Sequence, residues 1–297
     1  MALESDLQLF KEVQKHATEM ENDSDHKEMH EAIDAMWKMD WKDKPTSTEL
    51  KLTISPTARN SAKGAIRLMT ATDPIISVPY DKSDDTAREK SDQLERVASA
   101  VWYTNGRIRQ KPLHYDIVKN AILYGQIHMG IASTADLIAQ QSGEKTAAQA
   151  RIEQAASRVP YIFDVYDSRS CYIETDHLGL SAHYRKVKKK SSYVLDNWGQ
   201  RAIEIGMKTE SRFEDVDYCE YWDYVNHVVW IDGKGEPLYS GPHNLPRIPI
   251  IAQVVDDEPF LYTLWKSGIW ERQNLELTVM YSLIAWLANS PTFLYVA

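Results

Sequence analysis

The feature that most constrains this chain is an apolar segment near its C-terminal end, from Phe260 to Asn289. Gly268 is the only glycine in the segment, which contains no proline. This pattern predicts one helix, and a helix that continues through it is about 45 Å long. Its charged residues all lie at or before Glu276 and are Lys266, Glu271, Arg272 and Glu276.

The second half of this segment is apolar on almost every side of the expected helix. No charged residue follows Glu276. The apolar side chains are Leu277, Val279, Met280, Tyr281, Leu283, Ile284, Trp286 and Leu287. A helix that is apolar all round is either buried on every side or surrounded by lipid. The sequence then ends on the apolar residues 293–297. We therefore expect partner subunits, or residues downstream of Ala297, to cover this surface.

Two arrangements could cover the apolar helix. In the first, copies of the chain pack side by side. The interface residues expected for it are Trp265, Ile269, Arg272, Leu277, Met280, Leu283, Ile284 and Leu287. In the second, residues 277–297 anchor the chain in a membrane, because they are uncharged and about long enough to span one. Asn289, Ser290 and Pro291 interrupt that span, which favours the first arrangement.

Net charge and cysteine content limit the function classes further. The 297 residues include 34 Lys and Arg and 43 Asp and Glu, so the formal net charge is −9. Such an acidic chain is poorly suited to wrapping nucleic acid through its whole surface. The two cysteines, Cys171 and Cys219, exclude a disulfide scaffold and a zinc site made of cysteines alone. The first ten residues carry acids and lack an apolar core, so we expect no signal peptide and a reducing, cytoplasmic setting.

Hydrophobic periodicity predicts an α+β chain in four parts. Residues 1–45 form an acidic helical arm of two amphipathic helices with solvated faces, and residues 46–259 form a body of helices and antiparallel sheet. Residues 260–289 form the apolar helix, and residues 290–297 form a short final segment. In the body we expect helices at 60–70, 86–105, 112–129 and 191–205. The expected strands are at 52–54, 75–79, 161–166, 171–174, 183–188, 218–231 and 250–255.

Motifs for catalysis or metal binding are weak. Residues 142–146 imitate the end of a phosphate-binding loop, but Glu144 places a carboxylate where phosphate would bind. His26 and His30 have the four-residue spacing of helical metal ligands, which leaves a metal-dependent enzyme open as an alternative. Lys27, however, replaces the glutamate that a zinc protease carries, and the helix is strongly polar, so a solvated face is favoured. Both cysteines lie in expected strands, where a buried cysteine serves as a small apolar residue. We therefore predict no catalytic residue, no metal ligand and no cofactor.

One strongly basic run is the candidate for contact with nucleic acid or an acidic partner. Its members are Arg185, Lys186, Lys188, Lys189 and Lys190. Strand alternation would place the even-numbered lysines on one face, where they could contact phosphates. A solvated edge strand that lysines protect from aggregation explains the run equally well.

Three stretches carry a family resemblance. The first runs from Asn60 to Tyr80 and includes the sequence DPIISVP, and helices that end in Trp102 and in Tyr124-Gly125 follow it. The second combines residues 163–167 with residues 184–186 and a helix that ends at residues 198–199. The third comprises residues 220–222, the proline-bounded turn at 242–249 and a long helix that contains Gln273-Asn274. In order and spacing, these stretches resemble portal proteins of tailed bacteriophages, the head–tail connectors at the capsid vertex.

The resemblance implies a structural role without enzymatic activity. The α+β body would be the portal wing, the helix from Phe260 the stem, and residues 290–297 the start of the clip. A portal is a homo-oligomeric ring, a dodecamer by this resemblance. It conducts double-stranded DNA without sequence specificity during genome packaging and ejection. The implied partners are the terminase, the capsid and tail adaptor proteins, with no membrane. The implied locations are the virion and, during assembly, the host cytoplasm.

A portal chain continues with the rest of the clip, a returning stem helix, a tunnel loop and a crown. None of these follows Ala297, so we expect an incomplete portal, either a fragment or a truncated reading frame. The net negative charge suits a DNA conduit, because mild repulsion lets a polyanion slide where tight phosphate binding would hold it.

Overall fold

The computed structural model describes residues 2–22, 26–41, 52–80, 85–134, 158–243 and 245–289, together with positions 153 and 156. Contacts divide the chain into two compact units. The sheet unit comprises residues 1–24, 73–117 and 126–254, and the helical unit comprises residues 25–72, 118–125 and 255–297. Helices occur together with antiparallel sheets, which confirms the α+β class.

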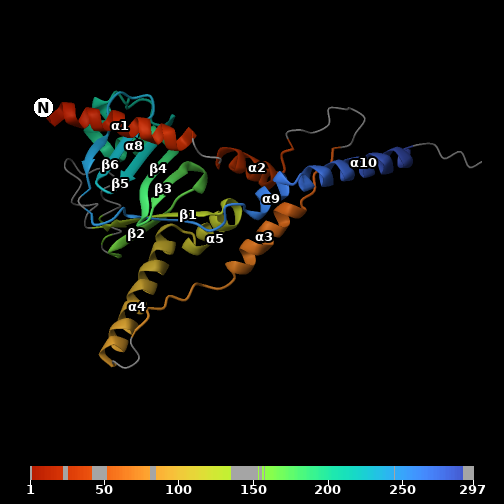
Figure 1. The fold of residues 1–297 in the computed structure, drawn as a ribbon, viewed down its shortest axis with the longest axis horizontal. Helices are drawn as coiled ribbons and strands as arrows, with labels where there is room; N and C mark the ends of the chain where they lie inside the picture. The colour runs from red at the N-terminus through yellow and green to blue at the C-terminus, as the bar shows by residue number, and fades with distance from the viewer. Residues whose placement is uncertain are drawn as a thin grey trace, which may run out of the picture. The chain divides into compact units, whose positions relative to one another are not determined.

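Two antiparallel sheets form the centre of the sheet unit (Figure 1). The larger sheet has the strand order β3-β4-β5-β6-β7. Its strands are β3 (Cys171–Asp176), β4 (Gly179–Lys190), β5 (Asp215–Asp223), β6 (Asn226–Ile231) and β7 (Tyr239–Pro242). The smaller sheet has the order β2-β1-β8. Its strands are β2 (Tyr161–Val165), β1 (Gln126–Ser133) and β8 (Ile250–Val254).

Strand alternation gives the larger sheet two apolar faces. Val228 and Trp230 of β6 belong to one buried cluster, and Val229 and Ile231 belong to another. Successive strand residues point to opposite faces, so the two clusters lie on opposite sides of the sheet. Helix α1 (Ala2–Asn22) covers the first face, and helix α8 (Ser191–Glu204) contributes to the cluster on the second.

Helix α1 is amphipathic, as predicted, and its apolar side is buried against the larger sheet. The side chains that it contributes to the core are Phe10, Val13, Ala17 and Met20. Burial of one large apolar side chain of this kind stabilises a fold by about 1.5–3 kcal/mol. The two helices expected in one arm belong to different units, because helix α2 (His26–Lys38) lies in the helical unit. The domain boundaries expected at residues 45, 259 and 289 stay predictions.

Helix α4 (Asp85–Ile108) is joined to the smaller sheet through one buried side chain. The Nδ2 group of Asn105 donates to the carbonyl oxygen of Tyr161 at 2.9 Å, and its Oδ1 accepts from the backbone N–H of Phe163 at 2.9 Å. These bonds satisfy backbone groups of β2, which is an edge strand of its sheet. The sequence placed a helix stop at Asn105, but the helix continues to Ile108.

Four helices build most of the helical unit. They are α2, α3 (Thr57–Met69), α9 (Phe260–Lys266) and α10 (Ile269–Asn289). Helix α9 contacts α2, α3 and α10, and Leu261 within it is fully buried. The end of helix α5 (Leu113–Tyr124) also belongs to this unit. There the hydroxyl group of Tyr124 donates a hydrogen bond of 3.0 Å to Asp34.

The predicted helix at 112–129 is wrong after Tyr124. Helix α5 ends at Tyr124, and residues 126–133 form strand β1. Gly125 separates them with a φ of +67°, a conformation that favours glycine. A Cβ atom at this position would lie 1.8 Å from the backbone oxygen of Asp256, so only glycine fits here.

The long strand predicted at 218–231 is a hairpin instead. Strand β5 ends at Asp223 and β6 begins at Asn226. The Oδ1 atom of Asp223 accepts hydrogen bonds from the backbone N–H groups of Val225 and Asn226, at 2.7 and 2.6 Å. This Asx turn reverses the chain within a run of apolar and aromatic residues, where periodicity alone shows no break.

The single helix expected over residues 260–289 is not confirmed, because it is divided into α9 and α10. Gly268 has a φ of +67°, and its backbone N–H donates to the carbonyl oxygen of Trp265 at 2.9 Å. A glycine in this conformation is a common helix terminator. The short strands expected at 52–54 and 75–79 are also wrong, since neither segment forms a strand in the structure.

Candidate functional site

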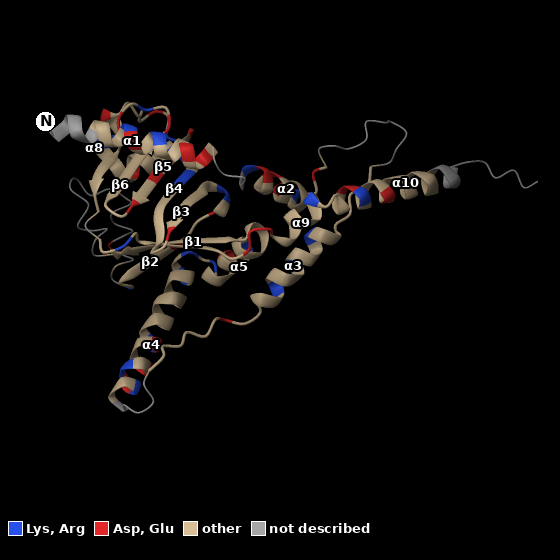
Figure 2. Ribbon diagram, viewed as in Figure 1, with Lys and Arg blue, Asp and Glu red and all other residues tan. Residues whose placement is uncertain are grey.

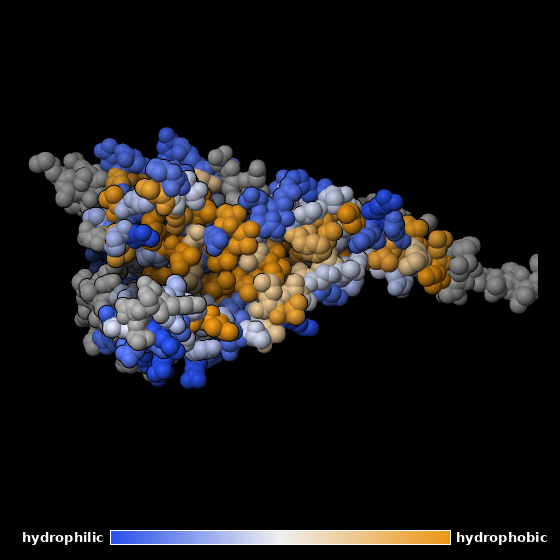
Figure 3. Space-filling view, turned by 60° about the horizontal axis from the view of Figure 1, so that its bottom comes forward, coloured by the Kyte–Doolittle hydropathy of each residue, from blue (hydrophilic) through white to orange (hydrophobic). Residues whose placement is uncertain are grey.

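Helix α10 carries a set of large apolar side chains that the described residues leave exposed. Leu283 is 55% exposed, Ile284 is 52% exposed and Met280 is 47% exposed. We call this surface the α10 apolar face; its members are Ile269, Leu275, Val279, Met280, Tyr281, Leu283 and Ile284. Figure 3 shows hydrophobic side chains at the surface of this segment, at the right of the view. Contiguous exposed apolar surface of this kind marks an interaction site.

The opposite stripe of α10 is the part that the helical unit buries. Trp270, Asn274 and Thr278 are each at most 3% exposed and recur every fourth residue, so they share one side of the helix. The Oδ1 atom of Asn274 accepts a hydrogen bond of 2.8 Å from the backbone N–H of Ser55. The hydroxyl group of Thr278 accepts from the N–H of Thr53 at 3.1 Å and donates to its carbonyl oxygen at 3.2 Å.

In the second half of α10 these contacts depart from the usual arrangement of a surface helix, which buries its apolar side and exposes its polar side. Here two polar residues are buried because they satisfy the backbone of the extended segment before α3. Meanwhile leucine, isoleucine, valine and methionine side chains face outward. Figure 2 shows that charged residues lie at the start of α10 and that none follows along its described part. Among the residues that the structure describes, none covers this apolar surface.

The structure distributes the predicted interface residues over different environments. Ile269, Met280, Leu283 and Ile284 are exposed as expected. Arg272 is exposed and donates a hydrogen bond of 3.0 Å to Glu276. Trp265 and Leu277 are half-buried, and the side chain of Leu287 lies outside the described residues, as do residues 290–297.

The predicted set missed Leu275, Val279 and Tyr281 of the α10 apolar face. The sequence contained a signal that could have found them. Asn274 and Thr278 are the polar pair at four-residue spacing, which could have identified the side of the helix that faces its own chain. Among the helices that the structure describes, none combines the length and apolarity needed to cross a lipid bilayer.

The basic run on β4 is largely matched by carboxylates. Arg185 donates a hydrogen bond of 2.6 Å to Glu220, and Lys190 lies 2.9 Å from Asp215. Lys186 lies 3.0 Å from Asp232 and 3.4 Å from Glu21. Partial burial opposes the charge of Lys186, but these two carboxylates outweigh it and raise its pKa.

Strand β4 is an edge strand only in part, and the remaining two lysines of the run, Lys188 and Lys189, lie in that part. Lys189 lies 4.7 Å from the ring centre of Tyr193, and partial burial lowers its pKa. Strand β4 pairs with β5 along residues 182–190, and with β3 only as far as Arg185. Residues 186–190, which include Lys188, therefore pair with β5 on one side and with no described strand on the side of β3. Contact of this run with nucleic acid stays a prediction.

A buried polar cluster lies on the face of β4 and β5 that points away from α1. Arg185 lies over the ring of Tyr166 at 3.8 Å and pairs with Glu220. Glu220 also accepts from Trp222 at 3.2 Å and lies 3.3 Å from His227. Burial alone would raise the pKa of Glu220, but Arg185 and His227 reverse this and hold it well below its usual range.

His183 of β4 adjoins this cluster and contacts His128 of β1, with ring centres 5.5 Å apart. Both imidazoles are fully buried. Burial, together with the neighbouring His128, lowers the pKa of His183 to about 3, so the ring is neutral at physiological pH. His30, which with His26 has the spacing of helical metal ligands, is buried rather than on the solvated face expected for it, and it packs edge-on against Tyr124 with ring centres 5.2 Å apart. The side chain of His26 lies outside the described residues.

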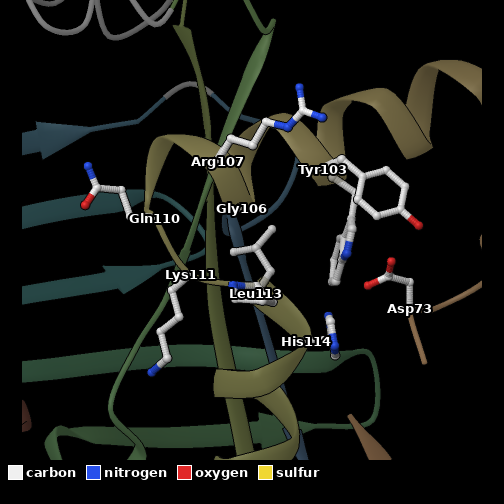
Figure 4. A pocket seen from close by; sticks show the side chains of 10 residues that line it. Asp73, Tyr103, Gly106, Arg107, Gln110, Lys111, Leu113 and His114 are labelled. Atoms are coloured by element: carbon white, nitrogen blue, oxygen red, sulfur yellow. The ribbon is translucent and has the colours of Figure 1, made fainter. Parts of the chain in front are cut away.

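A surface pocket of about 330 Å³ lies where α4 ends and α5 begins (Figure 4). Asp73, Tyr103 and His114 lie on one side of it. The side chains of Arg107 and Lys111 point away from one another (Figure 4). The ionisable groups therefore do not converge on one point, as catalysis or phosphate binding would require.

Comparison with models of protein families and with curated proteins gives no match for this sequence. The resemblance to portal proteins therefore stays a prediction from the three sequence stretches.

Proposed function

We propose that this protein is a ring-forming structural subunit of the portal type, which assembles with copies of itself through the α10 apolar face. The observation that carries this proposal is the exposure of large apolar side chains along the second half of α10, which no other described residue covers. The three sequence stretches that resemble portal proteins support it independently.

A second copy of this chain suits the α10 apolar face better than a charged partner. The exposed side chains of Arg272 and Glu276 lie 3.0 Å apart and offset one another within the helix. Identical helices placed side by side therefore bring no net charge together from this pair. Side-by-side contact between one side of a helix and another side of its neighbour generates a ring when the rotation closes.

The role of the ring is a conduit for double-stranded DNA at the capsid vertex during packaging and ejection. The net charge of −9 and the carboxylate partners of the basic run support passage of DNA without tight binding. The terminase would dock on the ring from outside, and capsid and tail adaptor proteins would surround it. The ring itself catalyses no reaction in this proposal.

Native mass spectrometry and negative-stain imaging of the purified chain at micromolar concentration test the assembly. We expect closed oligomers for the wild type. Leu283→Asp should convert them to monomers, because an unpaired charge in an apolar seam costs several kcal/mol, roughly as for other buried unpaired charges. The substitution should leave the thermal unfolding of the single chain unchanged, since Leu283 is exposed there.

Two variants serve as controls. Leu178→Asp changes a leucine that is 78% exposed in the turn between β3 and β4, and it should leave the oligomers intact. Asn274→Ala removes the bond to Ser55 and should lower the melting temperature without removing any member of the α10 apolar face. A wild-type chain that stays monomeric would overturn the proposal. Retention of the chain in a membrane pellet through a high-salt wash, lost on deletion of residues 277–297, would favour the membrane-anchor alternative instead.

A further inference from the structure

Three potential metal ligands meet in the interior of the sheet unit. They are His128 of β1, Cys171 of β3 and His183 of β4. Their ligand atoms all lie within 4.8 Å of one another, and each side chain is at most 1% exposed. Because Cys171 pairs with Arg185 across the strands, Cys171 and His183 lie on the same face of the larger sheet.

His183 supplies a second, independent observation. Neither of its ring nitrogens has a hydrogen-bond partner among the residues that the structure describes, although the side chain is fully buried. Buried polar groups in native proteins almost always have a partner. A buried imidazole whose two nitrogens lack one therefore indicates a ligand that is not part of the polypeptide. Its neutral state leaves a lone pair available for that ligand.

We propose that His128, Cys171 and His183 bind a zinc ion that links the two sheets of the sheet unit. Two imidazole nitrogens and one thiolate form a donor set that zinc prefers. In a tetrahedral zinc site, such donors lie about 3.4–3.6 Å apart, as the usual Zn–N and Zn–S bond lengths require. Contraction by about 1 Å, through small side-chain rotations, brings the three ligand atoms to this spacing, and a water molecule completes the coordination.

The surroundings of the ligands fit this role. Gln126 Oε1 lies 3.2 Å from the Nε2 atom of His128. A proton on Nε2 donated to Gln126 directs Nδ1 toward the ion, which is how outer partners orient histidine ligands. Burial raises the pKa of the Cys171 thiol to about 12, while Arg185 acts in the opposite direction. Zinc binding therefore displaces the thiol proton to solvent, and one proton is released for each ion bound.

The site is structural, because its ligands are inaccessible to a substrate. A zinc ion here would join a strand of the smaller sheet to two strands of the larger one. An ion that binds the folded protein in large excess over its dissociation constant stabilises the fold, and we expect a rise in melting temperature of about 5 °C or more. This inference does not depend on the proposed ring assembly, because all three ligands belong to one unit of one chain.

The experiment compares two buried cysteines in the full chain. Cys219 is also a buried free cysteine, but it lies on the opposite face of the larger sheet, beside Tyr184. Elemental analysis of the purified wild type and Cys219→Ala should find about one zinc ion per chain. Cys171→Ala and His183→Phe should retain less than a tenth of that amount. Circular dichroism confirms that each variant is folded.

Cobalt substitution gives a readout that does not depend on stability. After chelation, Co²⁺ added to the wild type and to Cys219→Ala should produce a sulfur-to-cobalt charge-transfer band in the near ultraviolet. Cys171→Ala should lack that band. A folded wild type with neither zinc nor a shift in melting temperature at excess zinc would overturn the proposal. Equal loss of zinc in Cys219→Ala would do the same, and copper in place of zinc would overturn the identity of the ion.

Discussion

At the scale of single residues, the pair between Arg185 and Glu220 is the most buried arginine–carboxylate contact among the described residues. Both side chains are largely buried, and the pair directly bridges neighbouring positions on β4 and β5. Removal of one partner leaves the other charge buried without compensation, which costs more than the pair contributes when intact. The contact therefore restricts substitution at both positions more strongly than its energy alone suggests.

Arg185→Ala should lower the free energy of unfolding by about 3–5 kcal/mol, as measured for broken buried ion pairs. Urea denaturation followed by tryptophan fluorescence measures this loss. The matched control is Arg212→Ala, because Arg212 pairs with Asp196 at 2.9 Å on the exposed surface. That change should cost less than about 1 kcal/mol. Equal effects of the two substitutions would show that Arg185 is not a buried partner of Glu220.

At the scale of elements, periodicity predicted most helices and strands but missed the places where single residues reverse the chain. Helices α3, α4 and α8 and strands β2, β3, β4 and β8 occur near their expected positions. Periodicity extended the helix at 112–129 past Gly125, whereas the family resemblance placed its end at Tyr124-Gly125, where the structure ends it. The tight contact of Gly125 with the backbone of Asp256 could not be predicted, because it joins residues far apart in sequence. The hairpin at Asp223 was missed because apolar and aromatic residues continue on both sides of the turn.

The candidate sites, like the helices and strands, were predicted where the signal is local in sequence and missed where it depends on distant contacts. The apolar character of α10 follows directly from the sequence, since no charge comes after Glu276. The spacing of Asn274 and Thr278 indicates which side of the helix is buried, but their partners, the backbone groups of Ser55 and Thr53, could not be predicted because they lie far away in sequence. The histidine–cysteine cluster has no sequence signature, because its three ligands come from three separate strands.

Two glycines of the helical unit should respond in opposite ways to the same substitution. Gly125→Ala places a methyl group against the backbone of Asp256 at a φ of +67°, so it should destabilise the protein by more than about 1 kcal/mol. Gly64→Ala lies within α3, where a Cβ atom has no neighbour within 4 Å. It should stabilise the protein by about 0.5–1 kcal/mol through helix propensity.

Thermal unfolding of the two variants beside the wild type measures both effects. A neutral Gly125→Ala would show that the contact with Asp256 is not maintained in solution.

At the scale of the whole molecule, charge and apolar surface have separate roles. The excess of carboxylates both sets the net charge and provides partners for Arg185, Lys186 and Lys190 of the basic run. Association through the α10 apolar face should therefore persist at high salt, because apolar contact is not weakened by ionic screening. Contact with DNA depends instead on lysine and arginine side chains that are not paired with carboxylates. The affinity for DNA should therefore decline steeply as the salt concentration rises.

The purified protein should therefore bind double-stranded DNA only weakly at physiological salt, with a dissociation constant above about 10 µM, in the range of non-specific contacts. Fluorescence anisotropy of a labelled duplex, measured across a salt series, tests this expectation. The double variant Lys188→Ala/Lys189→Ala removes the two lysines of the basic run that form none of its three close pairs with carboxylates. The matched control, Lys11→Ala/Lys15→Ala, removes two exposed lysines of α1. If the wild type bound DNA tightly, and only the first double variant lost that binding, β4 would be a phosphate-binding strand. The picture of a conduit that repels its cargo would then be wrong.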